Sequence, residues 1–196
     1  IEVISVKVST LYSQILSIAH RRAIQVLCER MELLYRAAAR TEFTRADGTV
    51  VPKFVYLDME EYRDLRITVD IFMETLSRPG LKGVSAGIAL QAYLPDSALV
   101  QRQITQWARA RVADGGAPVT IRIVKGANME MERVEASIEG WSQAPFMTKA
   151  DTDASYKLMI EYGLRPENAL AVHIGVASHN LFDVSYALVL TAEREV

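Results

Sequence analysis

Short apolar runs rich in β-branched residues alternate along the chain with longer stretches in which apolar residues recur at helical spacing. The short runs predict five strands, over residues 3–8, 53–57, 86–92, 119–124 and 169–176. The longer stretches predict helices over residues 13–39, 60–76, 96–113, 131–140, 151–162 and 181–193. Each predicted strand is therefore followed by a helix, and the fourth strand is followed by two helical pieces.

Turn and capping residues divide these segments. Asp47 and Gly48 mark a turn before the second strand, and Pro79 with Gly80 closes the second helix. Asp96 is the expected N-cap of the third helix. Because the series contains no convincing hairpin, we expect parallel strands joined by right-handed helical crossovers.

Strands that are apolar on both faces are typical of a parallel sheet covered by helices. Two α/β architectures contain such a sheet, an open doubly wound fold and part of a (βα)8 barrel. Five units share the 196 residues, so a unit takes about 39 residues, and eight units would need roughly 310, within the size range of such barrels. The chain shows no linker, repeat or second domain, so residues 1–196 are expected to form a single domain.

Composition fits a globular protein, because half of the residues are apolar and 23% are charged. Lys and Arg total 22 against 24 acidic residues, and the formal net charge of −2 provides no basic field for nucleic acid or for an anionic membrane. No apolar run is long enough to span a bilayer. The single cysteine, Cys28, has no internal disulfide partner, which favours a reducing cytoplasmic compartment.

Polar residues interrupt the apolar strands repeatedly at their carboxyl ends. In a parallel barrel these ends point to one face, where the active sites of such barrels are built. A concave site with several cations, a carboxylate and a histidine is suited to an anionic ligand. The strand-end residues are Lys7, Asp58, Gln91, Tyr93, Arg122, Lys125, Ser178, His179 and Asn180.

The fourth predicted strand leaves through Lys125, Gly126 and Ala127, just before a helix. Backbone N–H groups at such a turn, with two fixed charges beside them, form an arrangement that can receive a phosphate. The chain contains neither G-x-G-x-x-G nor G-x-x-x-x-G-K-[ST], which excludes a Rossmann or P-loop nucleotide site. A bound dinucleotide therefore requires another geometry.

The sequence shows no metal-binding pattern, because its three histidines are far apart and Cys28 stands alone. We interpret His20 as a surface residue and His173 as a hydrogen-bonded residue of the interior. His179, which follows a strand and precedes Asn180, is the better candidate for a functional histidine. Cys28 is expected to be a buried helix residue.

Six segments match the motifs of one known family in order and spacing. They are Val3-Ile-Ser-Val-Lys-Val-Ser9, Phe54-Val-Tyr-Leu-Asp-Met-Glu-Glu61, Leu90-Gln-Ala-Tyr93, Ile121-Arg-Ile-Val-Lys-Gly-Ala127, Thr148-Lys149 through Tyr156, and Ser178-His-Asn180. The chain resembles the flavin-dependent proline dehydrogenases over almost its whole length, most closely the proline dehydrogenase domain of bacterial bifunctional proline-utilisation enzymes. The resemblance implies a TIM-type (βα)8 barrel with FAD across its C-terminal rim, present here as about five serial βα units.

Residue by residue, the resemblance implies catalytic roles for Asp58, as the active-site acid, and for Arg122, beside the flavin. Lys7 matches a lysine at the substrate end. The implied reaction is hydride transfer from a carbon of L-proline to flavin N5, which yields pyrroline-5-carboxylate in the first step of proline catabolism. The positions that match FAD contacts are Met59, Gln91, Lys125, Gly126, Ala127, Thr148, Lys149, Ser178, His179 and Asn180.

The resemblance also implies partners and a location. The implied partners are L-proline, a quinone or other electron acceptor, and a fused or separate pyrroline-5-carboxylate dehydrogenase. The implied location is cytoplasmic, with at most peripheral association at the inner face of the membrane.

The chain departs from the family pattern in two respects. Asn128 stands where many relatives carry a large aromatic residue. Relatives also begin one strand earlier and continue into two further strands and a helix with paired arginines that clamp the substrate carboxylate. Since the chain starts with Ile1 inside a strand-like run and lacks a signal-peptide layout, we interpret it as a piece of a longer protein that forms a partial barrel.

Two alternatives compete with flavin chemistry. The first is a Schiff-base aldolase or decarboxylase barrel that uses Lys125 or Lys7 as its nucleophile, with a nearby cation to lower the lysine pKa. The second is a non-catalytic barrel fragment, whose open strand edges and apolar interior would favour pairing or aggregation.

Overall fold

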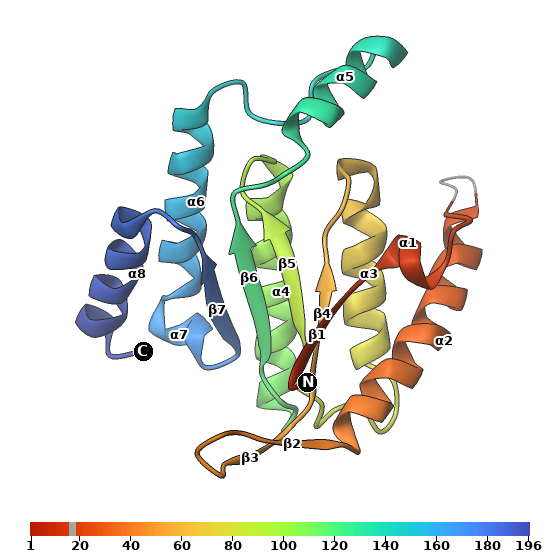
Figure 1. Cartoon of the computed structure of the whole chain (residues 1–196), viewed down its shortest axis with the longest axis vertical. Helices are drawn as coiled ribbons and strands as arrows, with labels where there is room; N and C mark the ends of the chain where they lie inside the picture. Colours follow the sequence, from red (N-terminus) through yellow and green to blue (C-terminus); the bar gives the residue numbers. More distant parts are fainter. Residues whose placement is uncertain (16–18) are drawn as a thin grey trace.

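The computed structural model describes residues 1–15 and 19–196, and its centre is a parallel sheet of five strands (Figure 1). The strands are β1 (Val3–Lys7), β4 (Phe54–Asp58), β5 (Gly87–Gln91), β6 (Val119–Val124) and β7 (Val172–Ala177). They are hydrogen-bonded neighbours in that order. The prediction of five parallel strands, adjacent in chain order, is confirmed.

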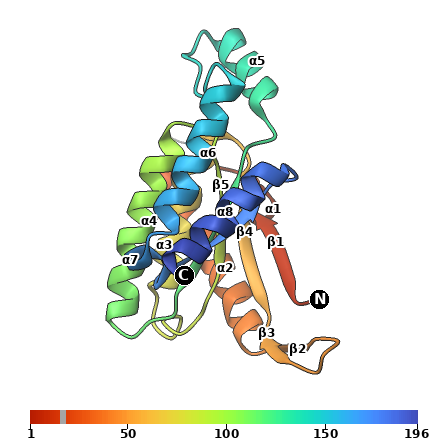
Figure 2. The ribbon, with the colours of Figure 1, turned by 90° about the vertical axis from the view of Figure 1, so that its left-hand side faces the viewer.

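The long helices cover one face of this sheet (Figures 1 and 2). In β4 and β6 alternate residues are buried against the helices, while the residues between them, on the opposite inner face, are only partly buried. A barrel wall has helices on one face, whereas a doubly wound sheet has them on both. The helices are α1 (Val8–Leu11), α2 (His20–Ala39), α3 (Leu65–Leu76), α4 (Asp96–Ala113), α5 (Met129–Glu139), α6 (Lys149–Gly163), α7 (Pro166–Ala169) and α8 (Leu181–Arg194), with the 3₁₀ turn η2 (Tyr62–Asp64) before α3.

A small antiparallel hairpin precedes β4 and consists of β2 (Glu42–Thr44) and β3 (Val50–Pro52). The expectation that the chain contains no hairpin is therefore wrong. The predicted turn is present, because the Gly48 N–H donates to the Arg45 carbonyl over 3.0 Å and Gly48 has φ of 85°. Asp47 Oδ1 also accepts from the Thr49 N–H over 2.9 Å. Strands of three residues are too short to show an alternating pattern, which is why the sequence does not reveal them.

The first predicted helix, residues 13–39, is shorter in the structure. Its main part is α2, which begins at His20, whereas residues 13–15 are not helical and residues 16–18 lie outside the described residues. Ile15 packs against the core from this loop, and apolar periodicity does not distinguish such a contact from a helical one. Val8, predicted as the end of a strand, is the first residue of α1 and is buried.

Two further boundaries differ from the prediction. Asp96 is the first residue of α4, not its N-cap, because Pro95 already has helical backbone angles and precedes it. The Asp96 carboxylate instead accepts a hydrogen bond from the Tyr62 hydroxyl at 2.8 Å. The last strand begins at Val172, later than predicted, because residues Pro166–Ala169 form α7.

The core lies between the sheet and the helices, and it includes the fully buried Leu57, Ile88 and Ile121 of the strands and Phe72 of α3. Below it, the buried Arg111 guanidinium donates to five backbone carbonyls. They belong to Leu76, Leu81, Lys82, Val84 and Ala117, at 2.6–3.0 Å. The side chain thereby fixes the loops at the amino ends of β5 and β6, opposite the strand ends that carry the predicted site.

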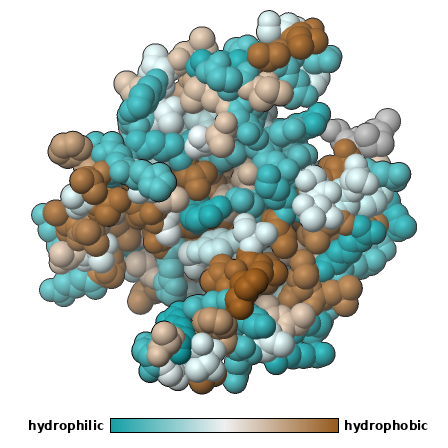
Figure 3. Space-filling model, in the orientation of Figure 1, coloured by the Kyte–Doolittle hydropathy of each residue, from teal (hydrophilic) through white to brown (hydrophobic). Residues whose placement is uncertain are grey.

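Large apolar side chains are exposed at both edges of the sheet. Figure 3 shows them over α8, where Leu181 and Phe182 are 78% and 83% exposed. At the other edge, Ile1 of the N-terminus and Val3 of β1 are exposed. Within the described residues β1 and β7 each have one neighbouring strand, as in an open section of a barrel.

Candidate active site

The inner face of the sheet carries the predicted catalytic group at the carboxyl ends of its strands. In the register, Lys7 of β1 pairs with Asp58 of β4, and Arg122 of β6 pairs with Ala89 of β5. Since residues paired in a parallel ladder point to the same face, Lys7, Asp58, Gln91 and Arg122 share the inner face. Four neighbouring strands each contribute one of these predicted residues to it.

Asp58 and Arg122 are joined across β5. Arg122 Nη2 lies 2.8 Å from Asp58 Oδ1, and the Met59 N–H donates to the same oxygen over 3.2 Å. The Arg122 guanidinium also lies over the ring of Tyr56, with its carbon 5.4 Å from the ring centroid. The side chains of Arg122 and Asp58 are 34% and 28% exposed, so the pair remains reachable from the inner face.

Gln91 is almost fully buried, with 4% of its surface exposed. Its Nε2 donates to the Glu60 carbonyl over 3.0 Å, which leaves Oε1 as a buried acceptor with no partner. Arg122 Nε is likewise buried and has no partner. Unpaired buried polar atoms are rare in folded proteins, and here a donor and an acceptor occur on one face of the sheet.

Glu60 connects the ends of four strands. Its carboxylate lies 3.6 Å from Lys7 Nζ and accepts from the Ser9 N–H over 3.3 Å. Its carbonyl accepts from both Gln91 and Asn128, the latter over 3.1 Å. Asn128 stands where the resemblance leads one to expect an aromatic residue. Its side chain forms a hydrogen bond that links the loops after β4 and β6.

A second polar cluster lies at the ends of β6 and β7. Lys125 Nζ forms ion pairs with Asp153 of α6 and, at 2.8 Å, with Asp183 of α8. Asp183 also accepts from the Ser178 hydroxyl over 3.0 Å. Burial opposes the charge of Lys125, but its hydrogen bonds with Asp153 and Asp183 hold the Lys125 pKa above its ordinary value. The ammonium group beside the Tyr156 ring is therefore a structural cation.

A groove of about 640 Å³ opens beside this cluster and is lined mainly by predicted FAD contacts. Two predicted residues next to it cap helices. Asn180 Oδ1 accepts from the Phe182 N–H at the start of α8, and Thr148 Oγ1 accepts from the Asp151 N–H at the start of α6. The lining residues are Lys125, Lys149, Val176, Ala177, Ser178, His179 and Asn180.

Three predicted contacts lie elsewhere on the rim or below it. Gly126 has φ of 132°, and a Cβ there would lie 1.5 Å from the Tyr93 ring, so the turn requires glycine. Ala127 follows it and is exposed. Met59 is 6% exposed and packs into the hydrophobic core, so its side chain does not join the polar group.

The histidines and Cys28 have separate environments. His173 is exposed on β7, and not enclosed as predicted, because no further strand lies beside β7 within the described residues. His20 pairs with Asp70 at 3.5 Å on the surface, as its predicted surface position allows. Cys28 is buried, as predicted. Within residues 1–15 and 19–196, no cluster of three His, Cys, Asp or Glu side chains could hold a metal ion.

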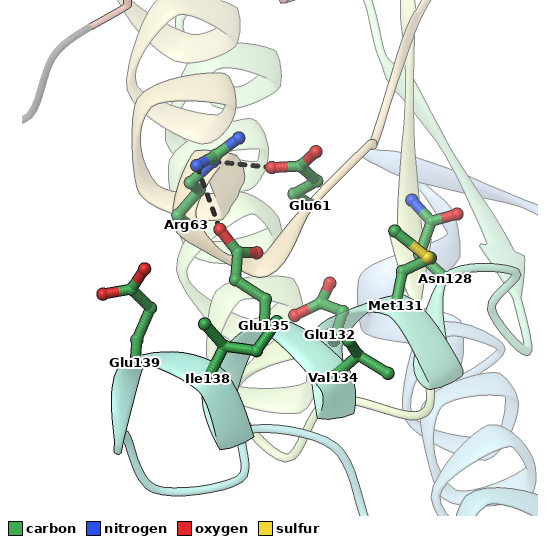
Figure 4. Close-up of a pocket in the computed structure, with 9 residues that line it drawn as sticks. All are labelled: Glu61, Arg63, Asn128, Met131, Glu132, Val134, Glu135, Ile138 and Glu139. Atoms are coloured by element: carbon green, nitrogen blue, oxygen red, sulfur yellow. Dashed lines mark hydrogen bonds and ion pairs between the residues drawn. The ribbon is translucent and has the colours of Figure 1, made fainter.

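A separate cavity of about 430 Å³ lies between α5 and the loop that leads from β4 to η2 (Figure 4). Arg63 of η2 pairs there with Glu61 at 2.6 Å and with Glu135 of α5 at 3.2 Å. Burial raises the pKa of the neighbouring Glu132, which accepts from the Tyr62 N–H and the Tyr93 hydroxyl. This cavity contains none of the predicted site residues.

Sequence reasoning missed four residues of the site. Tyr56 and Glu60 lie inside a quoted motif, but nothing in a motif shows that one side chain contacts Arg122 or that the other joins four loops. Asp153, which also lies inside a quoted motif, and Asp183 are on helices of the fourth and fifth units, so only the folded chain brings them to Lys125.

In the described part of the chain, no helix is both long and apolar enough to cross a membrane.

The chain was compared with family models, with curated proteins and with solved structures. The family model described as proline dehydrogenase matches residues 2–196. None of the curated proteins matches the chain at a significant level.

Solved structures of proline utilization A proteins match all or nearly all of the chain. The protein from Corynebacterium freiburgense is 42% identical with a TM-score of 0.91, and the match covers 100% of this chain and 19% of that one. The protein from Bdellovibrio bacteriovorus, inactivated by N-propargylglycine, is 32% identical with a TM-score of 0.85, covering 98% of this chain and 18% of that one. The chain thus spans about a fifth of the length of these proteins.

The open parallel sheet with polar strand ends corresponds to the barrel domain of those structures. The family match extends over nearly every residue, and the structural match extends over all of them. The chain therefore belongs to the proline dehydrogenase family.

Proposed function

We propose that this chain forms the central part of a flavin-dependent active site that oxidises L-proline to pyrroline-5-carboxylate. The observation that carries the proposal is the row of Lys7, Asp58, Gln91 and Arg122 on the inner face, in which Gln91 Oε1 and Arg122 Nε are buried without partners. An isoalloxazine ring presents N–H donors and carbonyl or imine acceptors along its edge, so it suits one free acceptor and one free donor. The residues present therefore fit FAD.

When bound, FAD supplies the hydride acceptor for the proline carbon, with N5 of the ring as the accepting atom. Gln91 and Arg122 would hold the ring edge. The groove beside Lys149, Ser178, His179 and Asn180 would receive the rest of the cofactor. Because Lys125 is already paired with two carboxylates, its contribution there is to shape the rim and not to offer a free charge.

The charged residues of the chain have distinct tasks. Arg122 would place a fixed cation beside the edge of a bound flavin ring, where negative charge develops on reduction, and a preorganised cation lowers the energy of that charge. Asp58 holds the guanidinium at 2.8 Å and so sets its direction. Lys7 would neutralise the proline carboxylate, and its pairing with Glu60 at 3.6 Å is loose enough for exchange to the substrate.

Partners of the longer relatives are part of the same proposal. The solved relatives are named proline utilization A, and one of them is described as a bifunctional protein. We infer that this barrel works with a fused or separate pyrroline-5-carboxylate dehydrogenase. A quinone or another acceptor would take up the electrons, in the cytoplasm or peripherally at the inner face of the membrane.

The ion pairs argue against Schiff-base chemistry. A lysine that attacks a carbonyl must be neutral near pH 7, which requires a lowered pKa. The pKa of Lys125 is raised by Asp153 and Asp183, and Lys7 faces the Glu60 carboxylate. Borohydride trapping with a carbonyl substrate is expected to leave both lysines unmodified.

The proposal is tested by FAD titration and by proline-dependent dye reduction. Arg122→Met is expected to weaken FAD binding or to lower the flavin midpoint potential, with a loss of about 1.5–3 kcal/mol for a charge-assisted contact. Arg102→Met, on the outer helix α4, is the matched control and should leave both unchanged. A chain that binds no FAD, or an Arg122→Met variant with unchanged affinity, potential and turnover, contradicts the proposal.

A further inference from the structure

The ring of Tyr56 lies on the inner face of β4, directly beside Gly87 of β5. The two residues pair in register, and a Cβ built on Gly87 would lie 2.2 Å from the Tyr56 ring. The edge of Phe54 packs against the same ring, with centroids 5.0 Å apart at 60°. The ring is therefore held between Phe54 and a bare stretch of β5 backbone.

Arg122 reaches this ring across an entire strand. Arg122 starts from β6, and β5 lies between β6 and β4. Its guanidinium meets the Tyr56 face at 5.4 Å and Asp58 at 2.8 Å. The path is open because β5 presents only Gly87 and Ala89 to the inner face at this level.

The ion pair alone is a weak restraint on Arg122. Both members are about one third exposed, and ion pairs that water can reach contribute little and fix geometry poorly. The ring face restrains the guanidinium in a second direction and shields it from water. The Nε of Arg122 is itself buried, so the base of the guanidinium is enclosed by protein even though its tip remains partly exposed.

We propose that Tyr56 is a positioning residue. Its aromatic ring packs on Gly87 and holds the Arg122 guanidinium in the orientation that contacts the edge of the isoalloxazine ring. This rests on the proposed function for the identity of the group that Arg122 meets. The contact between Tyr56 and Arg122 does not depend on it. Tyr56 acts only through Arg122, so its effect must disappear when Arg122 is replaced.

The first experiment measures FAD binding to the chain by quenching of flavin fluorescence. Tyr56→Leu removes the ring face and is expected to weaken binding roughly 3- to 30-fold, the range of one partly desolvated cation–π contact. Tyr56→Phe keeps the face and should bind like the parent chain. Gly87→Ala displaces the ring and should resemble Tyr56→Leu. A Tyr56→Phe variant as weak as Tyr56→Leu would overturn the proposal, because the hydroxyl would then be the active group.

The second experiment is a double-mutant cycle with Arg122→Met. In that background Tyr56→Leu is expected to change FAD affinity less than twofold. An equal loss in both backgrounds means that the ring acts by general packing, and the proposal fails. Tyr162→Leu is the matched control, since Tyr162 contacts Arg102 of α4 and Arg165, which precedes α7, and the substitution should leave FAD binding unchanged.

A third measurement needs no flavin and separates this inference from the proposed function. In the chain alone, the ring current of Tyr56 should shift the Arg122 Nε–H resonance upfield, with Arg122→Met identifying the signal. The shift should persist in Tyr56→Phe and be lost in Gly87→Ala and in Tyr56→Leu. If the shift is present but FAD does not bind, the proposed function fails and the contact stands. If the parent chain shows no shift, the contact is absent and the inference is wrong.

Discussion

The polar strand-end residues differ in what already satisfies them. Lys125 has two carboxylate partners, whereas Gln91 and Arg122 each keep one buried atom without a partner. A buried polar group left unpaired costs free energy that a ligand can recover. On the inner face, Gln91 Oε1 and Arg122 Nε are therefore the groups that a ligand can satisfy, whereas the Lys125 ammonium is already paired.

The ionisation of Tyr56 tests the Arg122 contact at the scale of one residue. Burial raises the pKa of Tyr56, and the Arg122 cation opposes that rise. Arg122→Met should therefore raise the Tyr56 pKa further, because the phenolate loses a neighbouring positive charge, so the ring ionises at higher pH. A ¹³C NMR titration of the chain with labelled tyrosine measures this pKa, and Tyr56→Phe identifies the Tyr56 signal. Arg63→Met on η2 serves as control, and a Tyr56 pKa that stays or falls contradicts the contact.

Gly126 tests the turn that follows β6. Gly126→Ala places a Cβ against the Tyr93 ring at a φ of 132°, whereas Gly140→Ala meets nothing within 4 Å at a φ of 68°. Both substitutions carry backbone strain, but only Gly126→Ala adds overpacking. We expect it to lower the free energy of unfolding by about 1–3 kcal/mol more than Gly140→Ala does. Urea denaturation measures both, and equal losses would show that the ring moves aside without cost.

At the scale of elements, Lys125 connects β6 to two helices. Asp153 lies on α6, Asp183 on α8, and the Asp183 side chain is only 3% exposed. Lys125 thereby fixes the positions of α6 and α8, which are helices of the fourth and fifth units. The groove lined by predicted cofactor contacts depends on that placement.

Lys125→Met should strongly destabilise the chain, because it leaves Asp183 buried with only the Ser178 hydroxyl as partner. Breaking a buried pair in this way costs about 3–5 kcal/mol. Lys149→Met, whose side chain is 82% exposed and pairs only with Asp153, is the control and should cost at most ~0.5 kcal/mol. Denaturation of both variants at neutral pH checks this, and similar small losses would show that Asp183 finds another partner.

The same cluster predicts a pH dependence. Hydrogen bonds from Lys125 and Lys149 hold the pKa of Asp153 below its ordinary value. A depressed carboxyl pKa favours the folded state above the unfolded pKa, and that contribution is lost as pH falls through the folded pKa. Stability measured from neutral to acidic pH should therefore decline less in Asp153→Asn than in the parent chain. An unchanged slope in this acidic range would contradict the role of the pair.

At the scale of the whole molecule, the inner face is open. Within the described residues, β1 and β7 have no outer neighbours, and apolar side chains are exposed at both edges (Figure 3). A flavin on this face would be accessible to water from both sides. Lys7 alone offers one point charge to a carboxylate, whereas a bidentate clamp requires arginine.

We therefore expect the 196-residue chain to be a poor proline oxidase, even with FAD. A longer protein with the two further strands and the arginine-bearing helix that the resemblance implies should be faster, since a displacement near 1 Å costs on the order of 10²-fold in rate. Proline-dependent dye reduction at equal flavin occupancy compares the two. Equal turnover would show that the added arginines are dispensable.

The sequence by itself determined the order of the strands, their parallel direction and the set of strand ends that carry polar residues. These follow from local patterns, since alternation of apolar runs and helical periodicity requires no knowledge of the fold. It also indicated the family through ordered motifs that include Asp58, Gln91 and Arg122. It missed the β2–β3 hairpin, whose strands are too short to show a period.

Only the tertiary structure decided how the polar residues are partnered. The contacts of Arg122 with Tyr56 and Asp58 cross a strand, and Lys125 meets carboxylates 28 and 58 residues away along the chain. Glu60 forms an ion pair with Lys7 and accepts hydrogen bonds from Gln91 and Asn128. The partner of a side chain depends on distances in space, which are set when the helices pack against the sheet. A local sequence pattern carries no information about those distances.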